Sequence, residues 1–266
     1  MRKYFEYVKN AFKENLAYRV EYFMGITQSL FLLLVQLYLW RALLGQSEQA
    51  STDMGVITLN EMTTYVLMST IISTLILSNV IRNINDRIRN GQISMDLIKP
   101  VNFKTYMFCS MIGRSFFNFL FQLLPVLAIG LIFIGIDYPS MQNLLLFCVT
   151  LVNAIIIMFL IQYSLGLLAF WYMSMWQVEM LLWTLIRLFS GAWIPLWFFP
   201  KILISISDFL PFRLMYFVPI SIYLGKVELV DSMYLLIQQL IWIVVLFGMT
   251  RLMWRAAIKK LVIQGG

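Results

Sequence analysis

The residues best placed to do chemistry form one short charged segment, residues 81–100, which reads IRNINDRIRNGQISMDLIKP. Its apolar residues recur at the spacing of one helix face: Ile81, Ile84 and Ile88. Its charged residues fall on the other faces of such a helix: Asp86, Arg87 and Arg89. Gly91 suits a helix C-terminus, and a second apolar turn ends before Pro100. The pattern predicts a rigid helical hairpin.

A charged hairpin of this kind is suited to docking a soluble partner protein. An ordinary loop enriched in basic residues beside a membrane helix has the same pattern. The residues of the segment leave both interpretations open.

The sequence lacks the residues that most enzymes and pumps use. It has no histidine, the commonest metal ligand. Its only Lys-Thr or Lys-Ser pair, Lys104–Thr105, follows Phe103 where a phosphate-binding loop needs glycine. The two cysteines, Cys109 and Cys148, lie in apolar stretches and favour neither a disulfide framework nor a zinc site. We therefore expect no metal, no cofactor and no catalytic residue in this chain.

Composition indicates where these residues lie. Of the 266 residues, 61% are hydrophobic and 12% are charged, against about 45–50% and about 25% in soluble domains. Continuous apolar runs predict membrane helices and not a barrel. Six runs are long enough to cross a membrane, at about 22–40, 62–81, 106–136, 143–171, 178–199 and 233–254. The sequence thus predicts an all-α integral membrane protein with six transmembrane helices in a single domain over residues 1–266.

Three connecting segments complete this topology. Residues 1–19 are amphipathic and predict either an interfacial helix or a cytoplasmic extension of the first span. Residues 82–104 form the charged loop between spans two and three. Residues 200–230 contain three prolines and charged residues, so we expect short external or re-entrant helices there instead of a crossing helix.

Basic residues predict the orientation of the chain. Fourteen of the 20 Lys and Arg residues lie in the N-terminal segment, in the loop 82–104 and near the C-terminus, whereas loops 45–60 and 137–142 have none. Because basic loops stay in the cytoplasm, both termini are expected there. The net charge of +7 reflects this bias and does not indicate a nucleic-acid partner.

Polar residues inside the spans are candidates for a transport path. A stripe of hydroxyls follows one face of the second span: Thr63, Thr70, Thr74 and Ser78. This stripe either lines a path or packs against another helix with its hydroxyls bonded to nearby carbonyls. Gln28 and Gln36 in the first span need a partner or a cavity, and Arg187 in the fifth either meets an anionic ligand or pairs with Glu179. No acid lies mid-span, which disfavours a proton or sodium relay.

The arrangement Ile-x-x-Gly-x-Ile-x-x-x-Leu-x-Lys-Pro, from Ile88 to Pro100, resembles the cytoplasmic loop of the type-2 ATP-binding-cassette (ABC) exporter permeases. A second region is similar as well: SGAWIPL at 190–196, Phe199-Pro200, Leu210-Pro211-Phe212 and Val218-Pro219-Ile220. The resemblance covers the whole chain in order. It is to the bacterial six-span half-permeases of about this length, which are often encoded as two unlike copies beside one ATPase.

The resemblance implies roles for named residues. A coupling helix would contact the ATPase, and it would contain Ile84, Asp86, Arg87, Ile88, Arg89 and Gly91. The translocation path would include Gln28, Gln36, Thr63, Thr70, Thr74, Ser78 and Arg187. An external gate would include Pro195, Pro200, Pro211 and Pro219.

The leading hypothesis is therefore a permease subunit that exports a lipophilic or amphipathic substrate, such as a drug, antibiotic, peptide or lipid-like molecule. Two copies of a separate ATPase would supply ATP and Mg²⁺ chemistry, and a second permease, identical or paralogous, would complete the path in the bacterial cytoplasmic membrane, in contact with lipid. The alternative is a non-transporting scaffold or sensor that recruits an ATPase or kinase. A lipid-modifying enzyme is disfavoured, because it would need clustered acids or histidines.

Overall fold

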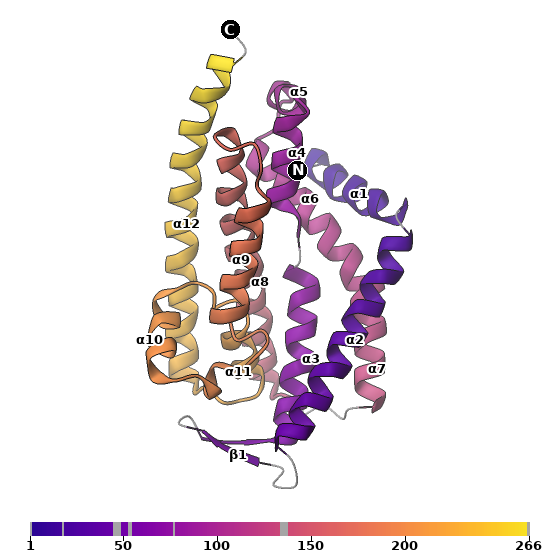
Figure 1. Ribbon diagram of the computed structural model, residues 1–266, viewed down its shortest axis with the longest axis vertical. Helices are drawn as coiled ribbons and strands as arrows, with labels where there is room; N and C mark the ends of the chain where they lie inside the picture. The colour runs from indigo at the N-terminus through magenta and orange to yellow at the C-terminus, as the bar shows by residue number, and fades with distance from the viewer. Residues whose placement is uncertain are drawn as a thin grey trace.

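The computed structural model describes residues 2–17, 19–44, 49–52, 55–76, 78–133 and 138–264. Over these residues the regular structure is helical apart from one two-stranded hairpin. The long helices run roughly along the longest axis of the molecule (Figure 1). The all-α architecture expected from the continuous apolar runs is therefore present.

Five helical stretches among the described residues are long and apolar enough to cross a membrane: Phe23–Leu44, Leu59–Arg89, Phe103–Ala128, Met141–Phe170 and Leu229–Lys260. They correspond to the first, second, third, fourth and sixth expected spans. Their main helices are α2 (Arg19–Leu44), α3 (Leu59–Ile76), α4 (Val80–Arg89), α6 (Phe103–Asn118), α8 (Met141–Leu167) and α12 (Leu229–Gln264). The positions of these five spans were predictable from hydropathy alone.

The fifth expected span differs from the prediction. Helix α9 (Trp176–Phe189) has 14 residues, which gives a length of about 21 Å against about 30 Å for the membrane core. It ends because Gly191 takes a left-handed conformation with φ of 79°. The chain then continues through a 3₁₀ turn, η4 (Leu196–Phe198). Residues 178–199 are therefore not one crossing helix.

Two of the spans are interrupted. Between α3 and α4, Ser78 and Asn79 belong to no helix. In the third span, α6 passes into a π-helical turn, η2 (Phe119–Leu123), before α7 (Leu124–Phe133). The turn ends two residues before Pro125, whose missing N–H removes one helical hydrogen bond and makes such a distortion favourable.

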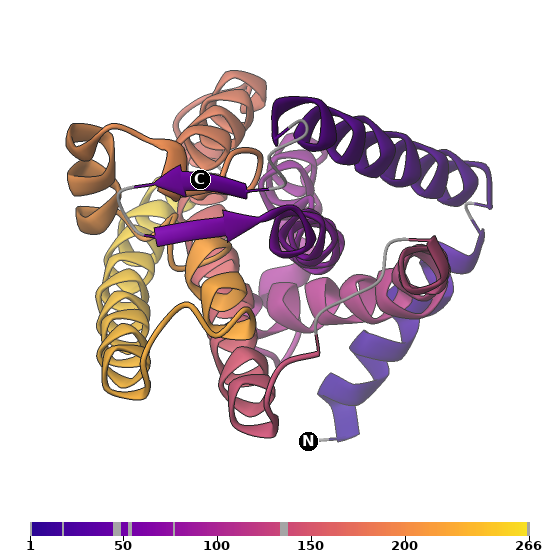
Figure 2. The same ribbon diagram turned by 90° about the horizontal axis from the view of Figure 1, so that it is seen from below.

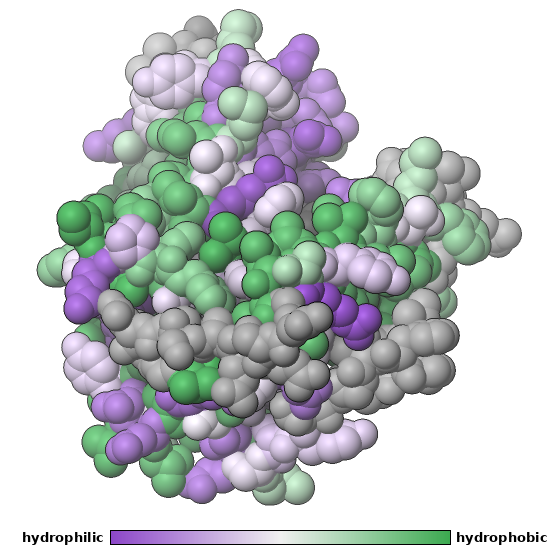
Figure 3. Space-filling view, turned by 60° about the horizontal axis from the view of Figure 1, so that its bottom comes forward, coloured by the Kyte–Doolittle hydropathy of each residue, from purple (hydrophilic) through white to green (hydrophobic). Residues whose placement is uncertain are grey.

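Helix α3 lies at the centre of the bundle. Buried residues make up 82% of its most apolar window, against 17% for α2 and for α12. Helix α8 and the short α11 (Phe217–Tyr223) pack against α3. Much of the middle of the visible face is hydrophobic, while hydrophilic side chains lie at its top and along its lower part (Figure 3). An apolar exterior of this kind suits a protein that faces lipid.

The amphipathic N-terminal segment forms α1 (Arg2–Ala17) and packs along α6. The contact is close at Gly113, where an added Cβ would lie 2.4 Å from the backbone oxygen of Val8. Phe12 contacts a cluster of rings on α6 and η2: Phe116, Phe117 and Phe121. The helix itself is thus as expected, and its position at a membrane surface stays a prediction.

The hairpin of β1 (Gln49–Thr52) and β2 (Gly55–Thr58) crosses one end of the bundle (Figure 2), a feature the sequence did not predict. It leads into α3 through a reciprocal cap, in which Thr58 N–H donates to the Glu61 carboxylate and Glu61 N–H donates to the Thr58 hydroxyl. Lys226 pairs with Glu61 at 2.6 Å. The pair ties this end of α3 to the chain after α11.

Residues 200–230 form α10 (Lys201–Phe209) and the buried α11 instead of a crossing helix. The four prolines named for an external gate occupy turns and first turns: Pro195 precedes η4, Pro200 precedes α10, Pro211 lies between the two helices, and Pro219 lies in the first turn of α11. These positions fit proline, which lacks an N–H and presets φ. Their part in a gate stays a prediction.

Candidate functional site

The charged segment folds into the hairpin that its pattern predicts, with α4 followed by a turn at Asn90 and Gly91 and then by α5 (Gln92–Ile98). Gly91 takes a left-handed conformation with φ of 69°, which favours glycine. The hairpin lies at the end of the bundle opposite β1 and β2, the same end as the C-terminus (Figure 1).

The apolar face of α4 is the part that anchors the hairpin. Ile84 is fully buried, and an added Cβ on Gly166 of α8 would lie 2.8 Å from its Cδ1 atom. The expectation that Ile84 contacts an ATPase is therefore wrong, because the side chain packs inside its own protein. Ile88, on the same face, is half-buried.

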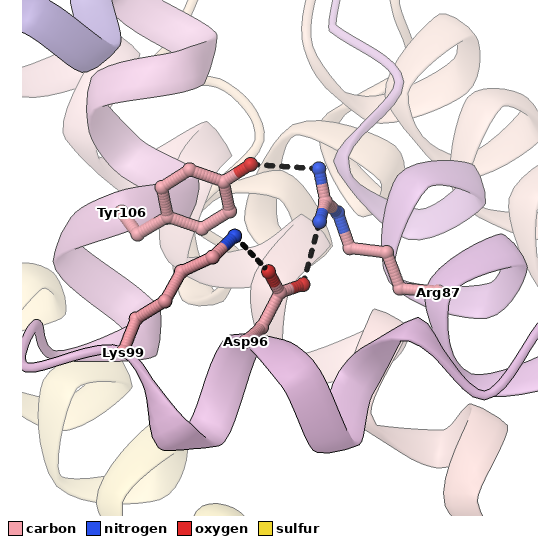
Figure 4. Close-up of polar contacts among 4 residues, drawn as sticks. All are labelled: Arg87, Asp96, Lys99 and Tyr106. Carbon is pink, nitrogen blue, oxygen red and sulfur yellow. Dashed lines mark hydrogen bonds and ion pairs between the residues drawn. The ribbon is translucent and has the colours of Figure 1, made fainter.

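A buried carboxylate braces the hairpin (Figure 4). Asp96 on α5 is 4% exposed and pairs with Arg87 at 2.5 Å and with Lys99 at 2.7 Å. Arg87 also donates to the Tyr106 hydroxyl at 2.7 Å. The hydrogen bond with Asp96 raises the pKa of the Lys99 ammonium. Arg87, which was expected to contact the partner, thus donates two hydrogen bonds within its own protein.

The exposed tip is where a partner could bind. Asp86, Arg89 and Gly91 are exposed, as expected for contact residues. Two apolar side chains of α5, Met95 and Ile98, are also 68% and 78% exposed. The sequence analysis did not single them out, although their i, i+3 spacing on a short helix whose other face is buried was a usable signal.

A polar cavity of about 340 Å³ lies between α2, α3 and the α6–η2 helix. Four of the seven expected path residues line it: Gln28, Gln36, Thr70 and Thr74. Further polar residues of its wall, which the sequence analysis did not name as path residues, are Ser29, Ser69, Ser73, Asn79, Arg114, Asn118 and Gln122. The structure therefore brings together much of the predicted set and adds residues from the third span.

The hydroxyls of α3 are bonded as the packing interpretation expected. Thr70 donates to the Val66 carbonyl and Thr74 to the Thr70 carbonyl, each at 2.9 Å. Each hydroxyl oxygen keeps acceptor capacity, so these threonines still present a polar wall. The carbonyl bonds of Thr70 and Thr74 are therefore as the packing interpretation expected, and a transport path along the stripe stays a prediction.

Three expected path residues lie outside this cavity. Thr63 is buried and donates to the Asn60 carbonyl. Ser78 donates to Gln162 of α8 at 2.9 Å. Arg187 lies exposed with its guanidinium 5.2 Å from the ring centroid of Trp193, and so borders the cavity only through that tryptophan.

The alternative pairing of Arg187 with Glu179 is also wrong. Glu179 lies 3.8 Å from Arg82 at the start of the hairpin. The two residues of the expected pair lie near opposite ends of α9.

A second, smaller cavity of about 190 Å³ lies beside the hairpin. It is lined from the hairpin by Asp86, Arg87 and Gln92, and it shares Asn79 and Arg114 with the first cavity. Asn79, at the interruption between α3 and α4, therefore lines both cavities.

A comparison with protein families identifies the chain. The family model described as ABC-2 family transporter protein matches residues 30–265. The chain belongs to the ABC-2 transporter family. No curated protein sequence matches it.

Membership of the ABC-2 family makes this a permease subunit of an ABC transporter, a multi-pass membrane component without an ATPase motif of its own. It implies an ABC ATPase as the partner.

The third span supplies the part of the cavity wall that the sequence analysis missed. Gln122 in the π turn donates to the Gly25 carbonyl at 3.1 Å and to the Ser29 hydroxyl at 2.8 Å. A glutamine within an apolar run was a signal for a buried polar contact. Its direction could not be read from sequence, because a π turn shifts every following side chain around the helix.

Proposed function

We propose that this permease forms half of an export path and that its α4–α5 hairpin transmits ATP-driven movement of an ATPase to the polar cavity. The observation that carries the proposal is the position of α4. One side of this helix packs against α8 through Ile84, and residues of the same helix border the cavity that shares Asn79 with the larger one.

The hairpin has the properties that transmission of force requires. Its two helices are joined by the ion pair between Asp96 of α5 and Arg87 of α4, so a push on α5 moves α4 as well. Its exposed tip combines Met95 and Ile98 with charged neighbours, which suits an apolar cleft with a polar rim. Two ATPase copies, each binding ATP and Mg²⁺, would contact two such hairpins in a complex with a second permease, identical or paralogous.

The cavity suits an amphipathic substrate. Its wall combines amides and hydroxyls with Leu32, Phe117 and Trp193. Amide and hydroxyl groups can donate to or accept from a substrate's polar part, while the apolar side chains accommodate its hydrocarbon. This mixed wall favours a transporter over a scaffold that merely recruits an ATPase, since a scaffold needs no polar cavity between membrane helices.

We place the protein in the bacterial cytoplasmic membrane with both termini on the cytoplasmic side. The position of the C-terminus at the hairpin end of the bundle supports this orientation (Figure 1). The basic residues in the hairpin and near the C-terminus support it as well.

The test co-expresses the permease with the ABC ATPase encoded beside it and measures whether the two proteins co-purify. The rate of ATP turnover is then measured in reconstituted vesicles. The double substitution Met95→Asp and Ile98→Asp should abolish co-purification, because it places charge where apolar contact is expected. Val230→Asp is the matched control, since Val230 is 79% exposed at the opposite end. Unchanged assembly and ATP turnover in the double variant would contradict the proposal that the hairpin contacts the ATPase. Normal assembly and turnover without movement of any substrate would favour the scaffold.

A further inference from the structure

Two basic side chains meet on the outer surface of the bundle where the first turn of α6 packs against α12. The Lys104 Nζ atom lies 3.4 Å from the ring centroid of Phe247. Arg251, one helical turn beyond Phe247 on the same face of α12, is close enough for its charge to repel that of Lys104. The two cations therefore flank one exposed aromatic ring.

A stack of aromatic rings holds this arrangement in place. Phe103, the residue before Lys104, is buried and stacks on Trp254 with ring centroids 5.3 Å apart and an interplanar angle of 12°. Tyr163 of α8 packs against both rings. Because this stack fixes α6 against α12, the two cations stay together despite their repulsion.

Within the described part of the chain, neither cation has an acidic partner. Lys104 and Arg251 form no ion pair there, and the Asp96 carboxylate at the hairpin is engaged by Arg87 and Lys99. The sequences of α6 and of α12 beyond Asp231 contain no acidic residue. Two cations held together without a counter-charge form a site for an anion.

The surroundings of the two cations indicate which kind of anion fits. Along α12, exposed apolar side chains continue from Phe247 toward the other end of the bundle, including Val244, Ile241 and Ile237. A small soluble anion would leave this surface uncovered, whereas the acyl chains of a phospholipid would lie on it. In the orientation proposed above, Lys104 and Arg251 lie at the depth of the cytoplasmic headgroups, where anionic lipids attract basic residues.

We propose that Lys104 and Arg251 form a binding site for the phosphate of an anionic phospholipid of the cytoplasmic leaflet, with the acyl chains along α12. The ring of Phe247 forms the wall between headgroup and chains. The site depends on the orientation given under Proposed function but not on transport or on ATPase binding.

The experiment measures lipid selectivity of the purified full-length protein in nanodiscs of equal parts phosphatidylglycerol and phosphatidylcholine, with retained lipids counted by native mass spectrometry. The wild type should retain phosphatidylglycerol in preference to phosphatidylcholine. The double substitution Lys104→Gln and Arg251→Gln should lower that preference by about fivefold for each cation removed. Arg89→Gln, which removes a charge at the exposed tip of the α4–α5 hairpin, should leave the preference unchanged.

Three outcomes would overturn the proposal. The first is an undiminished preference in the double glutamine variant. The second is loss of preference in the charge-preserving pair Lys104→Arg and Arg251→Lys, which also serves if the glutamine variant does not fold. The third is displacement of the retained lipid by millimolar inorganic phosphate, which would identify a site for soluble phosphate instead. Because ATP turnover is not part of the readout, failure here leaves the proposed function intact.

Discussion

Ile84 of α4 and Gly166 of α8 are in such close contact that no side chain fits between them, since an added Cβ on Gly166 would lie 2.8 Å from the Ile84 Cδ1 atom. This contact fixes the cytoplasmic hairpin to the bundle core. It makes the position of α4, and so the shape of the cavity it borders, depend on one small residue in the fourth span.

Gly166→Leu should displace α4 without touching the exposed tip. Overpacking of this kind costs about 1–3 kcal/mol, so the melting temperature in detergent should fall while co-purification with the ATPase persists. ATP turnover should lose its response to substrate, because the hairpin no longer holds its position. Gly248→Leu is the control, since nothing lies within 4 Å of a Cβ added there. Equal effects of the two substitutions would argue against a special role for the Ile84 contact.

Asp96→Asn should loosen α5 from α4. The substitution leaves Arg87 and Lys99 without their shared counter-charge, a change that typically costs about 1–3 kcal/mol for a buried hydrogen-bonded group. Hydrogen exchange should rise over residues 92–101 and stay unchanged in α8. Asp86→Asn, at an exposed position of the same hairpin, is the control. The account of the brace fails if both variants exchange at the wild-type rate.

The same ion pair predicts little response to pH. The hydrogen bond that the Lys99 ammonium donates to Asp96 raises the pKa of Lys99, so the stability that this pair contributes is fully present below the ordinary lysine pKa. It is lost only as the pH rises through the raised value. Hydrogen exchange of α5, corrected for its intrinsic pH dependence, should therefore be constant through the neutral range. A change near neutrality would show that another group controls the hairpin.

Thr74→Val should weaken substrate handling, because it removes a polar atom from the cavity wall at nearly constant volume. Thr63→Val is the matched control, since Thr63 has a similar bond to a nearby carbonyl but lies outside the cavity. Loss of one hydrogen bond corresponds to about 0.5–1.5 kcal/mol, or a few-fold rise in the concentration of a stimulating amphiphile needed for half-maximal ATP turnover. Identical shifts in both variants would remove Thr74 from the path.

Gln122→Leu should free η2 from α2. The amide of Gln122 bridges to Gly25 and Ser29, and no other pair of residues described here joins these helices by a side-chain amide. We expect the distribution of spin-label distances between the two helices to broaden. Gln142→Leu, at an exposed position in the first turn of α8, should leave this distribution unchanged. A distance distribution unaltered by Gln122→Leu would contradict the claim that the Gln122 amide holds η2 against α2.

Local patterns predicted much of this structure. The apolar runs predicted the five long apolar helices, the prolines at 200, 211 and 219 argued against a further crossing helix in that segment, and the periodicity around Ile84 predicted the hairpin. Each of these features follows from properties of neighbouring residues, which sequence periodicity records directly.

The missed features depend on residues far apart in the chain. The Gln162 side chain accepts hydrogen bonds from Ser78 and from the N–H of Val80, and so stabilises the interruption of the second span from 82 residues away. The sequence analysis did not single out Asp96, whose role depends on the fold that places Arg87 beside it as well as Lys99. Likewise, Gly191 ended α9 where hydropathy predicted a longer helix, since hydropathy carries no information on backbone conformation.

The central claim is that the hairpin carries the motor's movement to the polar cavity, and the accessibility of a cavity residue measures it most directly. In a background with Cys109 and Cys148 replaced by serine, Gln36→Cys is labelled with a water-soluble maleimide in vesicles containing the ATPase, with and without ATP. The account predicts that ATP changes the labelling rate and that Gly166→Leu abolishes the change while ATP turnover continues. A labelling rate unaffected by ATP in the otherwise wild-type, actively hydrolysing complex would contradict it.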